Sequence, residues 1–131
     1  MKMYDVVIIG GGIVGLSVAR ALSAYQLKIC VVEKDPDVAM GATKANSAIV
    51  HGGYAESADK VKGRLCYPGR RAFARLEEEL HFGFQPIGSL VITTRAEDLP
   101  KLEALLDNGR RNGLPDLEIL PGEQVRAMEP N

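Results

Sequence analysis

The feature that most restricts the fold is a pattern at the start of the chain. Residues 4–9 (YDVVII) are rich in β-branched residues and predict a strand, and residues 10–15 (GGGIVG) follow it without a linker. Residues 16–25 have helical spacing of small and apolar residues, and residues 27–32 (LKICVV) predict a second strand that ends at Glu33. This order of strand, glycine turn, helix, strand and acid predicts the βαβ unit that binds dinucleotides.

Each glycine of the turn has its own expected role. Gly10 allows a tight turn out of the strand, Gly12 lets the backbone approach a pyrophosphate, and Gly15 lets the helix pack closely on the strands. Glu33 lies where a carboxylate accepts hydrogen bonds from an adenosine ribose, and its charge disfavours the 2′-phosphate of NADP. The pattern leaves FAD and NAD open. The alternative is a glycine-rich turn in an ordinary βαβ unit, which the agreement of all the parts disfavours.

Composition and charge exclude several classes of protein. The 131 residues fit one ordinary domain, and 46% hydrophobic with 25% charged residues is typical of a globular chain. A formal net charge of −1 gives no general attraction to nucleic acid, and no apolar stretch approaches the roughly 20 residues that span a bilayer. Cys30 and Cys66 lack metal-ligand spacing, so we expect free thiols, no metal site and a cytoplasmic location.

The segment after the second predicted strand has a different character. Residues 41–48 (GATKANSA) are small and polar and cannot form the apolar face of an amphipathic helix. Such a segment suits a flat ligand, to which Thr43, Asn46 and Ser47 offer polar side chains. Composition alone supports a surface loop equally well. His51 follows in the sequence HGGY, where a structural histidine that caps a turn is the alternative to a functional one.

Together these residues resemble the flavoprotein superfamily of D-amino-acid oxidase and glycerol-3-phosphate dehydrogenase. Over residues 42–54 (ATKANSAIVHGGY) the sequence is similar to the large subunit of the anaerobic glycerol-3-phosphate dehydrogenases and to the L-2-hydroxyglutarate oxidases. The resemblance includes residues 60–66 (KVKGRLC) and 87–91 (IGSLV) and reaches the end of the chain. It implies FAD as the cofactor, held noncovalently, and a small anionic substrate whose identity it does not decide.

The resemblance also implies a role for each candidate residue. The glycines would face the FAD pyrophosphate, Glu33 would hold the adenosine ribose, and the polar side chains would lie along the pyrophosphate and the flavin. His51 would be the catalytic residue, beside the isoalloxazine ring on the substrate side. The implied cofactor-binding residues are Gly10, Gly12, Gly15, Glu33, Thr43, Asn46 and Ser47.

The rest of the chain predicts further helices and strands. A helix is expected over residues 59–82, with Ser57 as its N-cap and a kink or a break at Pro68-Gly69. The other expected elements are strands at residues 84–87, 89–94 and 117–120 and helices at residues 97–111 and 121–128. The predicted fold class is α/β: a Rossmann-like FAD-binding βαβ unit in a domain of residues 1–82, followed at residues 83–131 by the start of an α+β substrate domain.

A complete flavoprotein of this superfamily is several hundred residues long. We therefore expect an N-terminal fragment that is inactive alone and self-associates, from an enzyme that is cytoplasmic or peripheral to the inner membrane. The main functional prediction is an FAD-dependent dehydrogenase that oxidises a small 2-hydroxy anion, most specifically sn-glycerol 3-phosphate, by hydride transfer to flavin. The alternatives are an L-2-hydroxyglutarate oxidase and, from another class, a non-catalytic nucleotide-binding or scaffold module.

Overall fold

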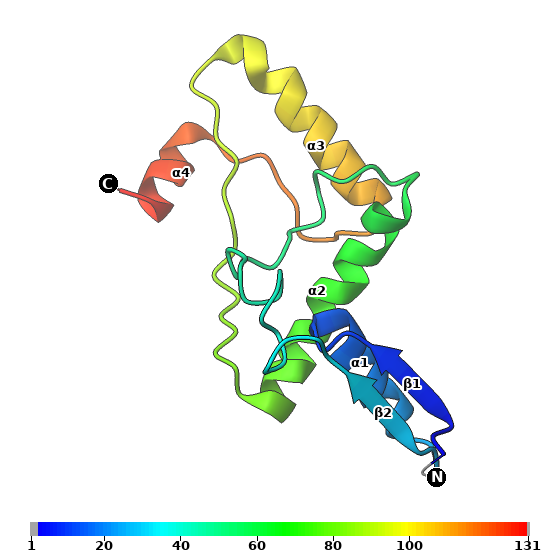
Figure 1. The fold of residues 1–131 in the computed structure, drawn as a ribbon. Helices are drawn as coiled ribbons and strands as arrows, with labels where there is room; N and C mark the ends of the chain where they lie inside the picture. Colours follow the sequence, from blue (N-terminus) through cyan, green and yellow to red (C-terminus); the bar gives the residue numbers. More distant parts are fainter. Residues whose placement is uncertain (1–2, 131) are drawn as a thin grey trace. The chain divides into compact units, whose positions relative to one another are not determined.

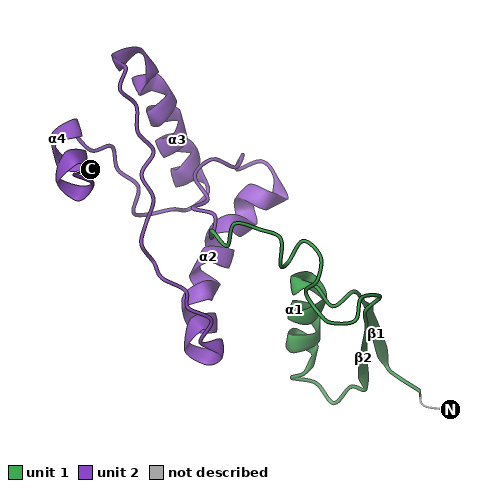
Figure 2. Ribbon diagram, turned by 60° about the vertical axis from the view of Figure 1, so that its left-hand side comes forward, with its two compact units in different colours: residues 1–49 green, residues 50–131 purple. Residues whose placement is uncertain are grey.

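The chain forms two compact units in a computed structural model that describes residues 3–130. The first unit contains the residues up to 49, and the second contains those from 50 onward (Figure 1, Figure 2). Two strands and one helix belong to the first unit, whereas the regular elements of the second unit are all helical.

The first unit is the βαβ arrangement that the glycine pattern predicts. Strand β1 (Val6–Ile9) and strand β2 (Ile29–Val32) pair in parallel, residue for residue, without an offset. Helix α1 (Ile13–Leu22) connects them, because a parallel pair needs a crossover rather than a hairpin. The structure therefore confirms the predicted α/β fold class and the order of elements around the glycine turn.

Helix α1 begins earlier than the predicted residues 16–25. Gly12 is the N-cap in an extended conformation, and its carbonyl oxygen accepts the N–H of Leu16 (2.9 Å). The helix ends at Leu22, where the hydroxyl of Ser23 donates to the Arg20 carbonyl oxygen (2.7 Å). A serine hydroxyl that bonds the last turn favours the end of a helix over its continuation.

One face of the two-stranded sheet packs against α1, and the other is open. Val6 and Ile8 are half-buried, whereas Val7 and Ile9 on the opposite face are 55% and 90% exposed. Apolar residues on both faces are typical of a parallel sheet that is covered on both sides. The sequence of β1 thus suits a sheet with a second covering layer.

Helix α2 (Val61–Leu80) is one continuous helix. The prediction at Pro68-Gly69 was a kink or a break, and the break is wrong: Pro68 lies inside the helix and removes a single N–H donor, while the turns on both sides persist. The kink stays a prediction. The predicted N-cap is also wrong, because Lys60 holds that position. Ser57 lies further upstream, and it is its carbonyl oxygen that accepts the N–H of Lys60 (3.1 Å).

The strands predicted at residues 84–87, 89–94 and 117–120 are absent from the described part of the second unit. A strand is stable only when a neighbour completes its ladder of hydrogen bonds, and the paired strands of the described chain are β1 and β2. The first two segments cannot pair with each other, since Gly88 alone separates them and a hairpin loop needs at least about two residues. Their apolar and β-branched composition favoured strands without supplying a partner.

The two later helices agree with prediction to within a few residues. One 3₁₀ turn, η1 (Ala96–Asp98), leads into α3 (Leu99–Arg111), and Gly113 follows with φ +83°, which favours glycine at the end of a helix. Helix α4 (Gly122–Met128) follows Pro121 as its N-cap. Neither these helices nor the others within residues 3–130 are long and apolar enough to cross a membrane.

The second unit is most tightly packed where α2, α3 and the loop before α2 meet. Leu114 is 3% exposed, and the neighbouring Asn112 is a buried polar residue at 8%. Glycines on both helices allow this close approach. A Cβ added to Gly63 of α2 would overlap the Ser57 carbonyl oxygen, and one added to Gly109 of α3 would overlap a leucine side chain.

Candidate cofactor site and the His51 loop

The glycine turn joins the end of β1 to the start of α1 and leaves little room for side chains. Gly10 adopts φ +103°, and its N–H donates to the Val32 carbonyl oxygen (2.7 Å) at the end of β2. A Cβ on Gly15 would overlap the carbonyl oxygen of Gly10, so helix and strand are as close as glycine allows. Gly12 differs: its φ is −79°, and an added Cβ would meet only the Thr43 hydroxyl, at 3.2 Å.

The N-terminus of α1 offers hydrogen-bond donors that the described chain leaves unused. The N–H of Ile13 donates to Oγ1 of Thr43 (2.9 Å). The N–H groups of Gly12, Val14 and Gly15 have no acceptor among residues 3–130. Unpaired N–H groups at the positive end of a helix dipole are suited to an anion.

Glu33 follows β2, and its carboxylate reaches the glycine turn. Oε2 accepts the N–H of Gly11 (2.6 Å), and Oε1 accepts the N–H groups of Lys34 (2.7 Å) and Asp35 (3.0 Å). The N–H of Asp35, and then that of Gly11, stabilise the anion and lower the pKa of Glu33 below its usual value of 4.5. A carboxylate has about four acceptor positions, so Glu33 keeps capacity for a further donor such as a hydroxyl.

The structure brings one of the three predicted polar side chains of residues 41–48 to the glycine turn. That residue is Thr43, through its bond to Ile13. Asn46 instead stabilises its own loop: Nδ2 donates to the Thr43 carbonyl oxygen (2.6 Å), and Oδ1 accepts the N–H of Ala48 (2.7 Å). Ser47 is exposed. The cofactor-binding roles of Asn46 and Ser47 stay predictions.

His51 belongs to the second unit and lies in the loop that precedes α2. Its Nδ1 accepts the N–H of Gly53 (3.0 Å), so a neutral imidazole carries its proton on Nε2. Nε2 lies 3.5 Å from Oε1 of Glu56, and 44% of the His51 side chain is exposed. The loop thus orients the ring while leaving it accessible.

Two charged residues next to His51 were not predicted from the sequence. Glu56 forms an ion pair with Lys62 of α2 through the same Oε1 that faces His51. This pairing lowers the pKa of Glu56 below 4.5 and raises that of Lys62 above 10.5, so both groups are charged at neutral pH. Little in the sequence predicts the ion pair of Glu56 and Lys62, because it joins an irregular loop to the first turn of a helix.

Two asparagines near the end of α3 hold the same loop and were also not predicted. Nδ2 of Asn108 donates to the carbonyl oxygens of Tyr54 and Glu56, both at 2.7 Å. Nδ2 of Asn112 donates to the carbonyl oxygens of Gly53 (2.8 Å) and Glu56 (2.7 Å). The signal in the sequence is the spacing of four, which places both amides on one face of the helix.

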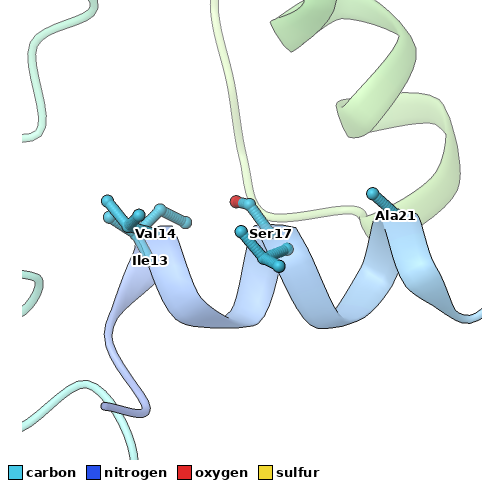
Figure 3. Close-up of a pocket in the computed structure, with 5 residues that line it drawn as sticks. Ile13, Val14, Ser17 and Ala21 are labelled. Carbon is cyan, nitrogen blue, oxygen red and sulfur yellow. The ribbon is translucent and has the colours of Figure 1, made fainter. Parts of the chain in front are cut away.

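One face of α1 is a shallow, almost entirely apolar hollow. It is lined by Ile13, Val14, Ser17, Val18 and Ala21, and Figure 3 shows labelled side chains of this group along one side of the helix. Ile13 and Val14 are 62% and 76% exposed. Apolar side chains that are this exposed and contiguous are typical of a surface that another element or molecule covers.

The class of protein follows from three features of the first unit: the βαβ arrangement, the open N-terminus of α1 and the acid at the end of β2. They are typical of an α/β nucleotide-binding protein. Residues 5–131 match the family described as "DAO: FAD dependent oxidoreductase". The chain belongs to this family, whose cofactor is FAD. The predicted resemblance and the predicted cofactor are thereby confirmed.

Individual relatives agree with the family. The chain is 43% identical to the glycerol 3-phosphate dehydrogenase of Caloramator mitchellensis over 129 residues, which cover 98% of this chain and 27% of that protein. It is 35% identical to the mitochondrial L-2-hydroxyglutarate dehydrogenase of Homo sapiens over 129 residues, 97% of this chain and 28% of that protein.

A solved structure extends the agreement to the fold. The dithionite-reduced L-α-glycerophosphate oxidase of Mycoplasma pneumoniae, with FAD bound, has a TM-score of 0.85 and 30% identity, and the match covers 99% of this chain and 35% of that one. The chain thus spans between 27% and 35% of the length of these three proteins.

Proposed function

We propose that this chain supplies the adenosine-binding end of an FAD-dependent oxidoreductase that oxidises a small 2-hydroxy anion, most specifically sn-glycerol 3-phosphate. The observation that carries the proposal is the N-terminus of α1, where unpaired N–H groups lie next to a turn that the Glu33 carboxylate contacts. Family membership supports the cofactor, because the family is one of FAD-dependent oxidoreductases.

The residues present fit the polar groups of the adenosine diphosphate half of FAD. A pyrophosphate suits the unpaired N–H groups of the first turn of α1, and the missing Cβ of Gly12 gives it room. An adenosine ribose suits the remaining acceptor capacity of Glu33. Gly10 and Gly15 act through shape, since they hold the turn close to the strands.

The polar segment after β2 completes the proposed site. Thr43 fixes the first N–H of α1, which leaves the following N–H groups free for phosphate oxygens. Ser47 is exposed, so its hydroxyl is accessible to a ligand. Asn46 would have to exchange its present loop hydrogen bonds for contacts to the cofactor.

His51 is the proposed catalytic residue. Bound FAD supplies the redox chemistry by accepting a hydride from the substrate carbon. Since Nδ1 of His51 already accepts the N–H of Gly53, the nitrogen left for a substrate is Nε2, which carries the proton in the neutral ring. This geometry favours His51 as a donor that orients a substrate oxygen over His51 as a base, and the hydroxyl proton that is lost with the hydride would then pass to water, to which the ring is open.

The choice of substrate rests on the relatives. The most similar relative named above is a glycerol 3-phosphate dehydrogenase, and the FAD-bound structural neighbour is a glycerophosphate oxidase. The second candidate is L-2-hydroxyglutarate, since mitochondrial dehydrogenases for that compound are up to 35% identical to this chain. Both compounds are small anions with a hydroxyl group at the second carbon.

The proposal extends to the protein as a whole. Residues 1–82 would belong to the FAD-binding domain and residues 83–131 to the start of the substrate domain. The chain alone would be inactive, since it spans only 27% to 35% of the three proteins named above. It would self-associate, because large apolar side chains such as Ile9 (90%), Val14 (76%) and Ile87 (87%) are exposed. The enzyme would be cytoplasmic or peripheral to the inner membrane.

The test uses the longest natural form of the protein that contains these residues. We expect a flavin absorbance spectrum that bleaches under anaerobic conditions on addition of sn-glycerol 3-phosphate, with the enantiomer sn-glycerol 1-phosphate as the matched control. Bleaching by L-2-hydroxyglutarate alone would replace the main proposal with the second candidate. A purified protein that neither contains nor takes up flavin would favour the non-catalytic module.

A further inference from the structure

The loop that carries His51 has no regular secondary structure, and its main chain is held by one side chain of α3 and by the side chain of the C-cap residue that follows α3. Three of its carbonyl oxygens, those of Gly53, Tyr54 and Glu56, accept hydrogen bonds of 2.7 to 2.8 Å from asparagine amides. These amides belong to Asn108 and Asn112, between 52 and 59 residues further along the chain. The conformation of the loop therefore depends on these two side chains.

The contacts of His51 lead directly to the residues that the asparagines hold. The partner of Nδ1 is the N–H of Gly53, whose carbonyl oxygen is bound by Asn112. The group that faces Nε2 is the carboxylate of Glu56, whose carbonyl oxygen is bound by both Asn108 and Asn112. Each ring nitrogen thus faces a group on a residue whose main chain is bonded by Asn108, Asn112 or both.

We infer that Asn108 and Asn112 are positioning residues that hold His51 in its protonated-Nε2 orientation for the reaction. The inference rests on the proposed function of His51. The asparagines themselves need not touch substrate or cofactor, because they act through the loop. Their expected effect is on the orientation and the tautomer of the His51 ring.

The orientation of the Asn112 amide supports a dedicated role. Asn112 is 8% exposed, and both donors of its Nδ2 are used by carbonyl oxygens of the loop. Its Oδ1 is buried and has no partner within the described chain. Exchanging the nitrogen and the oxygen would turn Oδ1 towards two carbonyl oxygens, so the amide has one acceptable orientation. A buried acceptor without a partner is unfavourable, and the two loop hydrogen bonds compensate for it.

The packing around Gly53 explains why a small shift of the loop main chain would change the position of the His51 ring. Gly53 is buried with φ +96°, and an added Cβ would lie 3.3 Å from Leu114 and 3.4 Å from Cys66. The loop therefore lies between α2 and the segment after α3 with little free space. A shift of the main chain at Gly53 would also displace its N–H, which is the partner of Nδ1 of His51.

The variants Asn112→Asp and Asn108→Asp replace a donor by an acceptor at constant size, so the loop carbonyls meet a repulsive group. If Asn112→Asp prevents folding because Asn112 is buried, far-UV circular dichroism would show it, and Asn108→Ala is the milder variant to use instead. The matched control is Asp107→Asn, the reverse exchange on an exposed neighbour (76% of the side chain) in the same helix.

The first readout is the tautomer of His51 in ¹H–¹⁵N spectra of the histidine rings of the longest natural form of the protein. The signals that disappear in His51→Ala are those of His51. We expect the protonated-Nε2 form in the wild type and in Asp107→Asn, and a mixture of tautomers in the Asn108 and Asn112 variants. A wild-type ring spectrum in a folded Asn108→Ala or Asn112→Asp variant would overturn the inference.

The second readout is the rate constant of anaerobic flavin reduction by sn-glycerol 3-phosphate. The asparagine variants should lower it by roughly 10- to 100-fold with unchanged FAD affinity. In a His51→Ala background they should have no further effect, because they act through His51. An equal loss with and without His51 would overturn the inference. A wild-type protein that this substrate does not reduce would refute the proposed function, and the ring spectra would still decide the positioning role.

Discussion

The two units of the molecule hold their candidate residues by different means. In the βαβ unit the partners are mostly main-chain groups: Gly10 bonds the end of β2, and Glu33 accepts three N–H groups. In the second unit the loop of His51 depends on the side chains of Asn108 and Asn112. The first unit thus relies on main-chain groups gathered around one carboxylate, whereas the loop of the second relies on two amides that are distant in the sequence.

The largest expected effect is at Gly15 in the first unit. Gly15→Ala places a Cβ onto the carbonyl oxygen of Gly10, a main-chain atom that cannot turn aside as a flexible side chain could. We expect a loss of about 3 kcal/mol or more in the free energy of unfolding, from urea titrations followed by circular dichroism. The control is Gly41→Ala, where an added Cβ meets no atom within 4 Å. Equal stability of the two variants would contradict the close packing of α1 on β1.

A neighbouring glycine should affect binding rather than folding. Gly12 has an ordinary φ of −79°, and an added Cβ meets only the Thr43 hydroxyl at 3.2 Å. Gly12→Val should therefore keep most of the stability while it fills the space proposed for the pyrophosphate, so that FAD is lost. Flavin that co-elutes with the protein from a desalting column measures this. Normal retention in the variant would place the phosphate site elsewhere.

The same contrast explains how much could be predicted from the sequence. The glycines, the flanking strands and Glu33 follow one another closely in the chain, and their order predicted the βαβ unit and its class of ligand. The contact of Glu33 with Gly11 was not predicted, because the sequence gives the position of the acid and not the direction of its side chain.

Prediction was weaker in the second unit because the decisive contacts are between distant residues. Asn108 and Asn112 had no recognisable motif, and their targets are carbonyl oxygens that every residue carries. The strands predicted at residues 84–87, 89–94 and 117–120 failed for a related reason: composition reports the preference of a segment, and a strand also needs a neighbour.

Helix α2 offers a matched pair that tests this close packing in the second unit. A Cβ on Gly63 would overlap the Ser57 carbonyl oxygen and lie 3.1 Å from Oδ1 of Asn112, whereas one on Gly69 meets no atom within 4 Å. We expect Gly63→Ala to cost about 1–3 kcal/mol and Gly69→Ala to stabilise by about 0.5–1 kcal/mol, because alanine favours a helix. Urea midpoints give both values. Stabilisation by both variants would show that the loop does not pack closely on α2.

The smallest expected effect is the acid dependence that comes from Glu33. Backbone N–H groups lower its pKa below 4.5, so near that pH the folded form binds fewer protons than the unfolded form. The contribution of Glu33 to stability is present above the unfolded pKa and is lost as the pH falls through the lower folded pKa. Glu33→Gln lacks this contribution, so the difference between the urea midpoints of wild type and variant should be constant from about pH 7 to about pH 5 and shrink towards about pH 3.

Glu77→Gln is the counterpart in the second unit, because the N–H of Phe84 lowers the pKa of Glu77 in the same way. A difference that does not change with pH in the Glu33 variant would mean that the charge of this carboxylate is not what stabilises the turn. The stability of the turn in the first unit would then come from the close packing of its glycines and not from the charge of Glu33.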